Sequence, residues 1–241
     1  MFSVLTKIAD IVIQFNSQYD VLPKACKKFE INEGIPEIII NVSEDDLAKE
    51  MKDYPVEDYV TPAEYEMTCA FRKLGSVIWK YDTLLFHSAG MKVDDSGIIF
   101  SAHSGTGKTT HMRLWKKLLG DRLKAINGDK PFIRFIDDKP VLFGTPWMGK
   151  EKFGMNSSAP LQNICFIERS ETNYVVKLNK EDIINRIFDQ VFLPSDPMGS
   201  ISTLQLIDKL LNSCNLWCIH CNMDIEAAEV AYNTIFSKQK G

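Results

Sequence analysis

The pattern of apolar and polar residues predicts a chain in which strands and helices alternate for most of its length. Short apolar runs that are rich in β-branched and aromatic residues and end at turn-forming residues predict strands. Residues 91–99 predict a strand, a turn at Asp94–Gly97 and a second strand. The other ranges predicted as strands are 11–15, 37–42, 77–81, 83–88, 123–126, 132–136, 140–143, 163–168 and 174–178.

Helices are predicted where apolar residues recur at a spacing of three or four, or where a helix start is visible. Thr61 and Pro62 are a typical cap and first residue, with Glu64 in the first turn, and they predict a helix that runs to about Lys73. A second helix is predicted at 109–119. In the final third of the chain, the same spacing predicts helices at 180–193, 201–212 and 224–237.

The order of these elements predicts an α/β fold with a mixed β-sheet and a helical C-terminal third. One hairpin precedes the 109–119 helix, and a second hairpin, with its turn at 137–139, follows it. Hairpin strands are antiparallel whereas a strand–helix–strand unit is parallel, so the sheet should contain both pairings. Residues 1–60, of which 43–58 are mostly polar, are predicted to form a β-rich extension packed on the core. Residues 61–241 form the predicted main domain.

The sequence SAHSGTGKTT at 101–110 lies between an apolar, β-prone run and a predicted helix. Strand, glycine-containing loop, Lys-Thr and helix form the context of a phosphate-binding loop (P-loop). Gly105 and Gly107 allow successive backbone N–H groups to face phosphate oxygens, and the helix adds the positive end of its dipole. Lys108 would reach the β- and γ-phosphates, and the Thr109 hydroxyl would bind Mg²⁺. The residues predicted to bind the nucleotide are Ser104, Gly105, Thr106, Gly107, Lys108, Thr109 and Thr110.

One position departs from the usual GxxxxGK[ST] pattern. Ala102 stands where the first glycine is expected, and an ordinary glycine-rich turn is therefore the alternative interpretation. The five adjacent residues from Ser104 to Lys108, together with Thr109 and the flanking elements, favour a nucleoside-triphosphate site.

The composition and net charge of the chain indicate which kinds of partner it does not bind. The 241 residues carry a net charge of −4, with 45% hydrophobic and 25% charged residues, which is typical of a globular protein. This charge argues against an extended nucleic-acid interface. No run approaches the ~20 apolar residues that cross a bilayer, and the N-terminal segment contains Lys7 and Asp10 and lacks the features of a signal peptide. We therefore expect a cytoplasmic protein with reduced cysteines that binds neither nucleic acid nor membrane.

Three cysteines and a histidine lie close together near the C-terminus and raise the question of a metal site. Cys214, Cys218, His220 and Cys221 fall within eight positions. Zinc sites usually combine two such clusters or well-separated ligand pairs. The segment 216–221 is instead typical of a buried strand in which thiols serve as small apolar residues, and we predict a strand here.

Three features in residues 83–178 follow one another in a recognisable order. His87 lies in a predicted strand that is followed by a hairpin and by the loop core SGTGKTT at 104–110, and Asp129 follows the short strand after the loop helix. In this order they resemble the catalytic domain of HPr kinase/phosphorylase, and the loop core is similar to that of ATP-dependent phosphoenolpyruvate carboxykinase. Short relatives of HPr kinase in bacterial gene clusters, which lack its N-terminal domain, are most similar in length.

The resemblance implies a fold, cofactors and a reaction. The fold is the mixed-sheet P-loop fold of the HPr kinase/phosphoenolpyruvate carboxykinase type, with ATP as phosphoryl donor and Mg²⁺ held by Thr109 and Asp129. The acceptor is a hydroxyl, in the serine of a peptide or protein or in a small molecule, and a homo-oligomer is left open. Gly128-Asp129-Lys130 replaces the paired aspartates of HPr kinases, and 144–152 differs from their later motif. HPr as the acceptor and phosphorylase activity therefore do not follow.

Positioning and charge stabilisation dominate phosphoryl transfer, so the catalytic candidates are charged or polar groups near the loop. Asp129 is the predicted acceptor of the hydroxyl proton or ligand of Mg²⁺. It is preferred over Asp137 and Asp138, which lie in a predicted turn where aspartate is common for conformational reasons. His87 would orient the hydroxyl or the γ-phosphate; the alternative is a half-buried strand histidine with one satisfied hydrogen bond.

Basic and histidine side chains near the loop provide further candidates. Lys150 or Lys152 would neutralise charge on the transferring phosphoryl group, the alternative being solvated surface lysines. His103 lies inside the loop, and His111 is expected on a helix face without a chemical role. Among the arginines, Arg134 is a weaker candidate, and surface ion pairs are expected for Arg113 and Arg169.

Two other functions compete with a kinase. A regulatory or accessory protein that binds ATP without turnover is favoured by Ala102 and by the missing second carboxylate. A decarboxylating carboxykinase would need a second substrate domain and more metal ligands than 241 residues accommodate. We therefore predict an ATP- and Mg²⁺-dependent kinase whose catalytic residues are Asp129, His87, Lys108 and Lys150.

Overall fold

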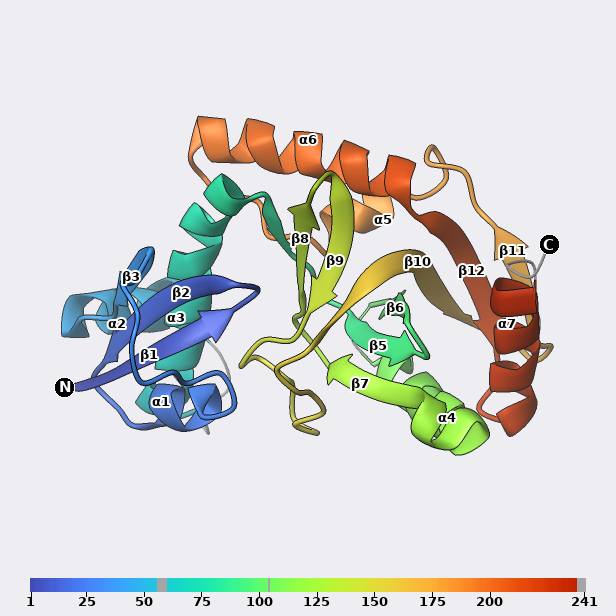
Figure 1. Cartoon of the computed structure of the whole chain (residues 1–241), viewed down its shortest axis with the longest axis horizontal. Helices are drawn as coiled ribbons and strands as arrows, with labels where there is room; N and C mark the ends of the chain where they lie inside the picture. Colours follow the sequence, from blue (N-terminus) through green and yellow to red (C-terminus); the bar gives the residue numbers. More distant parts are fainter. Residues whose placement is uncertain (56–59, 104, 238–241) are drawn as a thin grey trace.

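The computed structural model describes residues 1–55, 60–103 and 105–237, which form a mixed α/β structure with two β-sheets. In Figure 1 the smaller, N-terminal sheet lies at one end of the molecule and the larger sheet runs through its middle. No helix within these ranges is long and apolar enough to span a membrane.

The N-terminal sheet confirms the strands predicted at 11–15 and 37–42 and adds one before them. The added strand β1 is joined to β2 by a two-residue turn in which Ala9 and Asp10 have φ angles of 51° and 60°. Turns of this kind usually carry glycine or asparagine, so this sequence gives no hairpin signal. β1 and β2 are antiparallel, and β2 and β3 are parallel. The strands are β1 (Phe2–Ile8), β2 (Ile11–Ser17) and β3 (Ile38–Asn41).

Two short helices beside this sheet are absent from the prediction. The first is α1 (Val21–Cys26), and the second is α2 (Glu44–Asp53), which lies in the polar stretch 43–58. The α2 helix begins with a capping box, in which the Ser43 side chain accepts from the Asp46 N–H and the Asp46 side chain accepts from the Ser43 N–H. Its start is therefore encoded by the cap rather than by apolar periodicity.

The helix predicted from Thr61 is confirmed, and it is longer than expected. It forms α3 (Pro62–Ile78) and continues into the 3₁₀ helix η1 (Trp79–Tyr81), so the strand predicted at 77–81 is wrong. Leu74 and Ile78 are four residues apart and both buried, which is the spacing of one helix face. The β-branched and aromatic residues that predicted a strand extend this face.

The Thr61 cap gives a stability prediction. Its Oγ1 accepts from the Glu64 N–H, and the Glu64 carboxylate accepts from the Thr61 N–H at 2.8 Å. Thr61→Ala should lower the free energy of unfolding by about 1 kcal/mol, because the Glu64 N–H loses its side-chain acceptor. Urea unfolding measures this change, and Thr61→Ser, which keeps the hydroxyl, is the matched control. Equal stability of both variants would contradict the cap assignment.

The larger sheet contains both parallel and antiparallel pairs, as predicted. Its strands follow the order β4-β8-β9-β10-β6-β5-β7 among the described residues, and β12 pairs with β10 and β11. The β6–β10 and β10–β12 pairs are parallel, and the others are antiparallel. The strands are β4 (Thr83–Leu85), β5 (Ala89–Val93), β6 (Ser96–Ser101), β7 (Leu123–Asn127), β8 (Phe132–Ile136), β9 (Lys139–Phe143), β10 (Ser158–Arg169), β11 (Tyr174–Lys177) and β12 (Asn215–Cys221).

Both predicted hairpins are confirmed, and aspartates form their turns. Asp94 joins β5 to β6 with a φ of 52°, and Asp137 and Asp138 join β8 to β9 with φ angles of 47° and 62°. Aspartate tolerates the left-handed region better than most residues, so these positions are explained by conformation alone.

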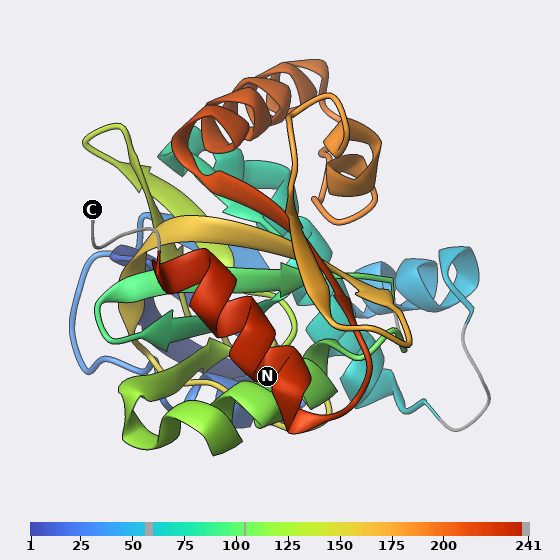
Figure 2. The same ribbon diagram turned by 90° about the vertical axis from the view of Figure 1, so that its right-hand side faces the viewer.

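Helices cover both faces of the larger sheet. Alternate residues of the central strands point to opposite sides, so Ile99 and Ile164 pack with α5 and α6, whereas Phe100 and Cys165 pack with α4 and α7. Figure 2 shows α7 crossing in front of the sheet with α4 beside it. The helix predicted at 180–193 is confirmed only over its centre. The helices are α4 (Lys108–Leu119), α5 (Ile184–Phe188), α6 (Pro197–Ser213) and α7 (Ile225–Ser237).

Candidate functional site

The P-loop sequence lies where the parallel strands β6 and β10 end, at one edge of the sheet. β6 ends at Ser101 and α4 begins at Lys108, with Gly107 as the residue before the helix. Gly105 and Gly107 have φ angles of 77° and 125°, and a Cβ on either would meet no atom within 4 Å. Glycine is therefore required by backbone conformation rather than by lack of space. Ser104, also predicted to bind the nucleotide, lies outside the described residues.

A cavity of about 440 Å³ lies beside this loop, and we call it the phosphate cavity. It brings together all four predicted catalytic residues, which come from four separate segments of the chain. Thr106 lies elsewhere on the loop and does not line this cavity. The lining residues that sequence analysis selected are His87, Gly105, Gly107, Lys108, Thr109, Thr110, Asp129 and Lys150.

His87 and Asp129 meet across the cavity. His87 Nε2 lies 3.2 Å from Asp129 Oδ1, and Lys130 Nζ donates to Asp129 Oδ2 at 3.1 Å. The backbone fixes both residues, because the His87 N–H donates to the Gln190 carbonyl at 2.7 Å and the Asp129 carbonyl accepts from the Ser88 N–H at 2.9 Å. The sequence suggests a role for each residue near the loop but does not predict that the two form a dyad.

Asn127 holds the turn that presents Asp129. It is fully buried, and its Oδ1 accepts from the N–H groups of Asp129 and Lys130 at 2.9 and 2.8 Å. Its amide donates to the carbonyl and hydroxyl of Thr145 at 3.1 and 3.0 Å. A Cβ on Gly128 would lie 2.9 Å from the Met148 carbonyl, so only glycine fits between. Sequence analysis did not select Asn127, although an Asn followed by a Gly is a signal of such a turn.

Asp129 is ionised at neutral pH. Burial raises its pKa, but hydrogen bonds and charges from His87 and Lys130 outweigh burial and lower the pKa to about 2. Its two oxygen atoms therefore carry a full negative charge inside a partly enclosed cavity.

Lys108 is folded back onto the start of its own loop. Its Nζ donates to the Ala102 carbonyl at 2.7 Å. Burial lowers the pKa of its ammonium group, and the negative charge of Asp129 opposes that effect. An ammonium group that donates to a backbone carbonyl can donate to an anionic ligand instead, where the bond is stronger.

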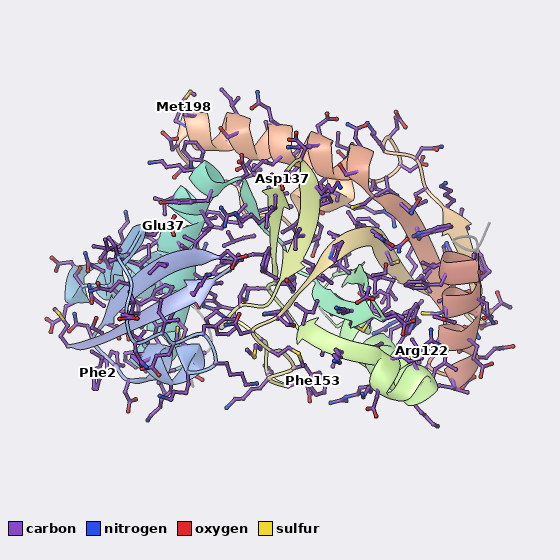
Figure 3. All side chains as sticks on the ribbon, viewed as in Figure 1. Phe2, Glu37, Arg122, Asp137, Phe153 and Met198 are labelled. Atoms are coloured by element: carbon purple, nitrogen blue, oxygen red, sulfur yellow. The ribbon has the colours of Figure 1, made fainter. Side chains whose placement is uncertain are left out.

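The segment 144–155 forms the opposite rim of the phosphate cavity. Trp147 is buried, packs edge-to-face against Phe15 and Phe71, and donates its indole N–H to the Met67 carbonyl at 2.9 Å. The exposed Lys150 lines the cavity. Lys152 does not line it. Phe153, labelled in Figure 3, comes from the same segment and lines the cavity too.

Asp137 and Asp138 lie in the turn between β8 and β9, away from the loop. Figure 3 places Asp137 at the tip of the β8–β9 hairpin, beneath α6. Asp138 pairs with Lys209 at 2.5 Å, and neither aspartate lines a cavity beside the loop. This placement agrees with the prediction that they serve the turn.

The remaining histidine and arginine candidates do not line the phosphate cavity. His111 is buried on α4, where burial lowers its pKa to about 4 and Trp115 Nε1 donates to it at 3.0 Å.

Arg113 pairs with Glu151 at 2.5 Å, as expected for a surface ion pair. The surface ion pair expected for Arg169 is wrong, because Arg169 Nη2 donates to the Gly105 carbonyl at 2.6 Å and so holds the loop. Arg134 donates to the Ala9 carbonyl and does not line the phosphate cavity.

Two more cavities adjoin the loop. The larger, of about 800 Å³, lies between the loop, the first turns of α4 and residues 221–224, and we call it the outer cavity. The smaller, of about 330 Å³, lies between the ends of β6 and β10 and the segment around α5, and we call it the inner cavity. His103 lines the inner cavity, and Thr106 lines both. The loop therefore separates three spaces.

The cysteine-rich segment 215–221 forms the buried strand β12, as predicted. Burial raises the pKa of Cys218 to about 11, so the thiol is neutral. Ligand atoms of Glu168, Cys218 and His220 lie within 4.8 Å of one another, and Arg186 is bonded to this Glu168 at 2.6 Å. Cys214 and Cys221, part of the four-residue metal hypothesis, are not in this group.

No family model matches the sequence, and no curated protein matches it. Among solved structures, the chain is similar to an HPr(Ser) kinase/phosphatase from Coxiella burnetii, with 7% sequence identity and a TM-score of 0.38. That match covers 64% of this chain and 98% of the other.

Proposed function

We propose that this protein is an ATP- and Mg²⁺-dependent phosphotransferase that phosphorylates a hydroxyl group. One observation carries the proposal: a loop with two glycines in positive-φ conformations, followed by Lys108 and Thr109, faces the His87–Asp129 dyad across a single cavity. Loop amides, a lysine, a hydroxyl and a carboxylate are the groups that phosphoryl transfer requires.

The arrangement of cavities supports a nucleotide that crosses the loop. The phosphate cavity and the outer cavity share Gly105, Gly107 and Thr110 as their common wall. The outer cavity is large enough for a nucleoside and is lined by Leu114 and Ile167 on its apolar side. In this proposal, the nucleoside lies there and the triphosphate extends over the loop to Lys108.

The oxygen atoms of Thr109 and Asp129 suit Mg²⁺. Both residues line the phosphate cavity, and Asp129 is ionised because its pKa is about 2. Magnesium prefers hard oxygen ligands and usually takes only one or two carboxylates from the protein. When bound, the ion would neutralise charge on the phosphate oxygens. A divalent cation would compete with Lys130 for Asp129 Oδ2.

The reaction proposed is a single displacement. The acceptor oxygen forms a bond to the γ-phosphorus, the bond from that phosphorus to the β,γ-bridging oxygen breaks, and ADP leaves with the electron pair. The hydroxyl proton passes to Asp129. A carboxylate with a pKa of about 2 is a weak base, so Asp129 acts mainly by orienting the hydroxyl and receives its proton late. His87 holds the carboxylate in place, and Lys150 offsets charge from the cavity rim.

The test is nucleotide binding followed by turnover. ATP with Mg²⁺ at about 100 times its Kd should stabilise the protein by about 2.7 kcal/mol. For a domain of this size, that corresponds to a rise in Tm of roughly 5 to 10 °C. Labelled phosphate from γ-labelled ATP should then appear on a hydroxyl compound in an acceptor screen. No shift in Tm with either ATP or GTP would contradict the proposal.

An ATP-binding regulator without turnover is the second candidate. The observation in its favour is that both oxygen atoms of Asp129 are already engaged, one by His87 and the other by Lys130. If Lys130 stays in place when nucleotide binds, Asp129 has no free oxygen for a hydroxyl. A rise in Tm with ATP but no phosphate transfer to any acceptor would favour this candidate.

A further inference from the structure

The inner cavity contains buried polar atoms without partners. Ser101 is fully buried and Gln190 is 8% exposed, and both line this cavity. Within the described part of the chain, neither Ser101 Oγ nor Gln190 Oε1 has a hydrogen-bond partner. Unpaired buried polar atoms are costly, so a cavity that contains two of them is suited to a ligand that supplies the missing bonds.

The inner cavity and the phosphate cavity have a wall in common, formed by residues that are hydrogen-bonded to one another. In this wall the His87 N–H donates to the Gln190 carbonyl, and Lys108 Nζ donates to the Ala102 carbonyl, each at 2.7 Å. His87 and Lys108 line the phosphate cavity, whereas Gln190 and Ala102 line the inner cavity. When Lys108 turns toward a phosphate it must leave the Ala102 carbonyl, and the wall loses that hydrogen bond.

The charged and polar groups that line the inner cavity favour a ligand that donates hydrogen bonds. Both of its arginines already have partners, since Arg169 donates to the Gly105 carbonyl and Arg186 pairs with Glu168. Asp189 is exposed, lines the cavity and has no ion-pair partner among the described residues. Apart from the exposed His103 imidazole, the open positions are thus a carboxylate, an amide oxygen and a hydroxyl, which favour a cation or N–H beside a hydroxyl and disfavour an anion.

We propose that the inner cavity binds the phosphate acceptor, and that this acceptor carries its hydroxyl next to an ammonium group or an N–H donor. The donor pairs with Asp189 and Gln190, and the hydroxyl reaches the γ-phosphate through the wall that Lys108 leaves. This inference rests on the proposed function and names its substrate class. Two sources have this chemistry: a free amino alcohol, and a seryl residue followed by a basic residue in a peptide.

The experiment measures probe binding to the full chain by calorimetry, with Mg²⁺ and a non-hydrolysable ATP analogue present. The probes are ethanolamine for the free source and the blocked dipeptide acetyl-Ser-Lys-amide for the peptide source. Glycolate, which has a hydroxyl beside an anion, is the charge-reversed control. At least one of the two probes should bind at least 10-fold more tightly than glycolate, and the ATP analogue should increase its affinity.

Variants then locate the binding site. Asp189→Asn is nearly isosteric and exposed, so it should fold, and Gln190→Leu removes the unpaired amide oxygen. Each should weaken probe binding roughly 10-fold or more and leave the Kd of the ATP analogue unchanged. Gln205→Leu, at an exposed glutamine of α6 that does not line the inner cavity, is the matched control.

The outcomes separate the two proposals. If the ATP analogue does not bind, the proposed function is wrong, and this inference is wrong with it. If the analogue binds but neither probe exceeds glycolate, or if binding is unchanged in both Asp189→Asn and Gln190→Leu, the inner cavity is not the acceptor site. The kinase proposal would survive that second result.

Discussion

Replacing Lys108 with alanine should lower phosphate transfer about 10³-fold. The ammonium group lines the phosphate cavity and is partly buried, so its charge is only moderately screened. Two unit charges about 4 Å apart at an effective dielectric constant of about 20 interact by about 4 kcal/mol. A loss of 1.4 kcal/mol is about tenfold in rate, so the whole effect is about three orders of magnitude. The measurement is the initial rate with γ-labelled ATP and Mg²⁺.

Stability measurements separate this effect from misfolding. Burial lowers the pKa of Lys108, which means that the folded protein disfavours its charged form, so Lys108→Ala should not lower the Tm of the nucleotide-free protein. The Tm rise with ATP should be lost instead. Lys117→Ala, at an exposed lysine of the same helix, is the control and should behave as wild type. A Lys108→Ala protein that keeps its nucleotide-dependent Tm shift would exclude the loop as the phosphate site.

The sequence predicts those parts of the fold whose signals are local. Both hairpins around the P-loop follow from apolar runs bounded by Asp turns, and α3 follows from the Thr61 cap. The strand predicted at 77–81 fails because β-branched and aromatic residues also fit the last turn of a helix that is packed on a core. Only the four-residue spacing of Leu74 and Ile78 reveals the helix, and that spacing is short.

In the candidate site, too, the residues that can be predicted are those with a local sequence signal. The loop and Asp129 can be predicted because a motif and a strand end mark them. Gln190 and Arg169 cannot, because each acts through a contact with a backbone carbonyl or N–H that is distant in the chain. Their side-chain types carry no signal of those contacts. A glutamine and an arginine at these positions of the sequence are ordinary residues until the fold brings the ends of β6, β10 and α5 together.

The N-terminal region contacts the segment 144–155, which forms the rim of the phosphate cavity. Trp147, next to the cavity-lining Met148, packs on Phe15 of β2, and Lys28 Nζ donates to the Gly154 carbonyl at 2.9 Å. Residues of β2, α3, β8 and β9 belong to one buried cluster with Trp147. The division into 1–60 and 61–241 stays a prediction, but these contacts show how the N-terminal sheet supports the segment that carries Lys150.

Replacing Asp129 with asparagine should lower phosphate transfer about 10²- to 10⁴-fold at neutral pH, because the hydroxyl and Mg²⁺ lose their carboxylate. Nucleotide binding through the loop amides and Lys108 should persist. Steady-state rates and the ATP-dependent Tm shift measure the two effects. Asp138→Asn, in the hairpin turn, is the control and should leave the rate unchanged. A rate for Asp129→Asn within a factor of three of wild type would remove Asp129 from the mechanism.

The same variant should change how stability depends on pH. The pKa of Asp129 is about 2 in the folded protein against about 3.9 for an aspartate in an unfolded chain, so the ionised form is favoured by folding. Its contribution, about 2 kcal/mol, is fully present above about pH 4 and is lost as the pH falls through about 2. Urea unfolding at about pH 6 and about pH 2.5 should therefore show a smaller acid-induced loss in Asp129→Asn than in wild type. Identical losses in both proteins would mean that His87 and Lys130 do not hold the Asp129 carboxylate.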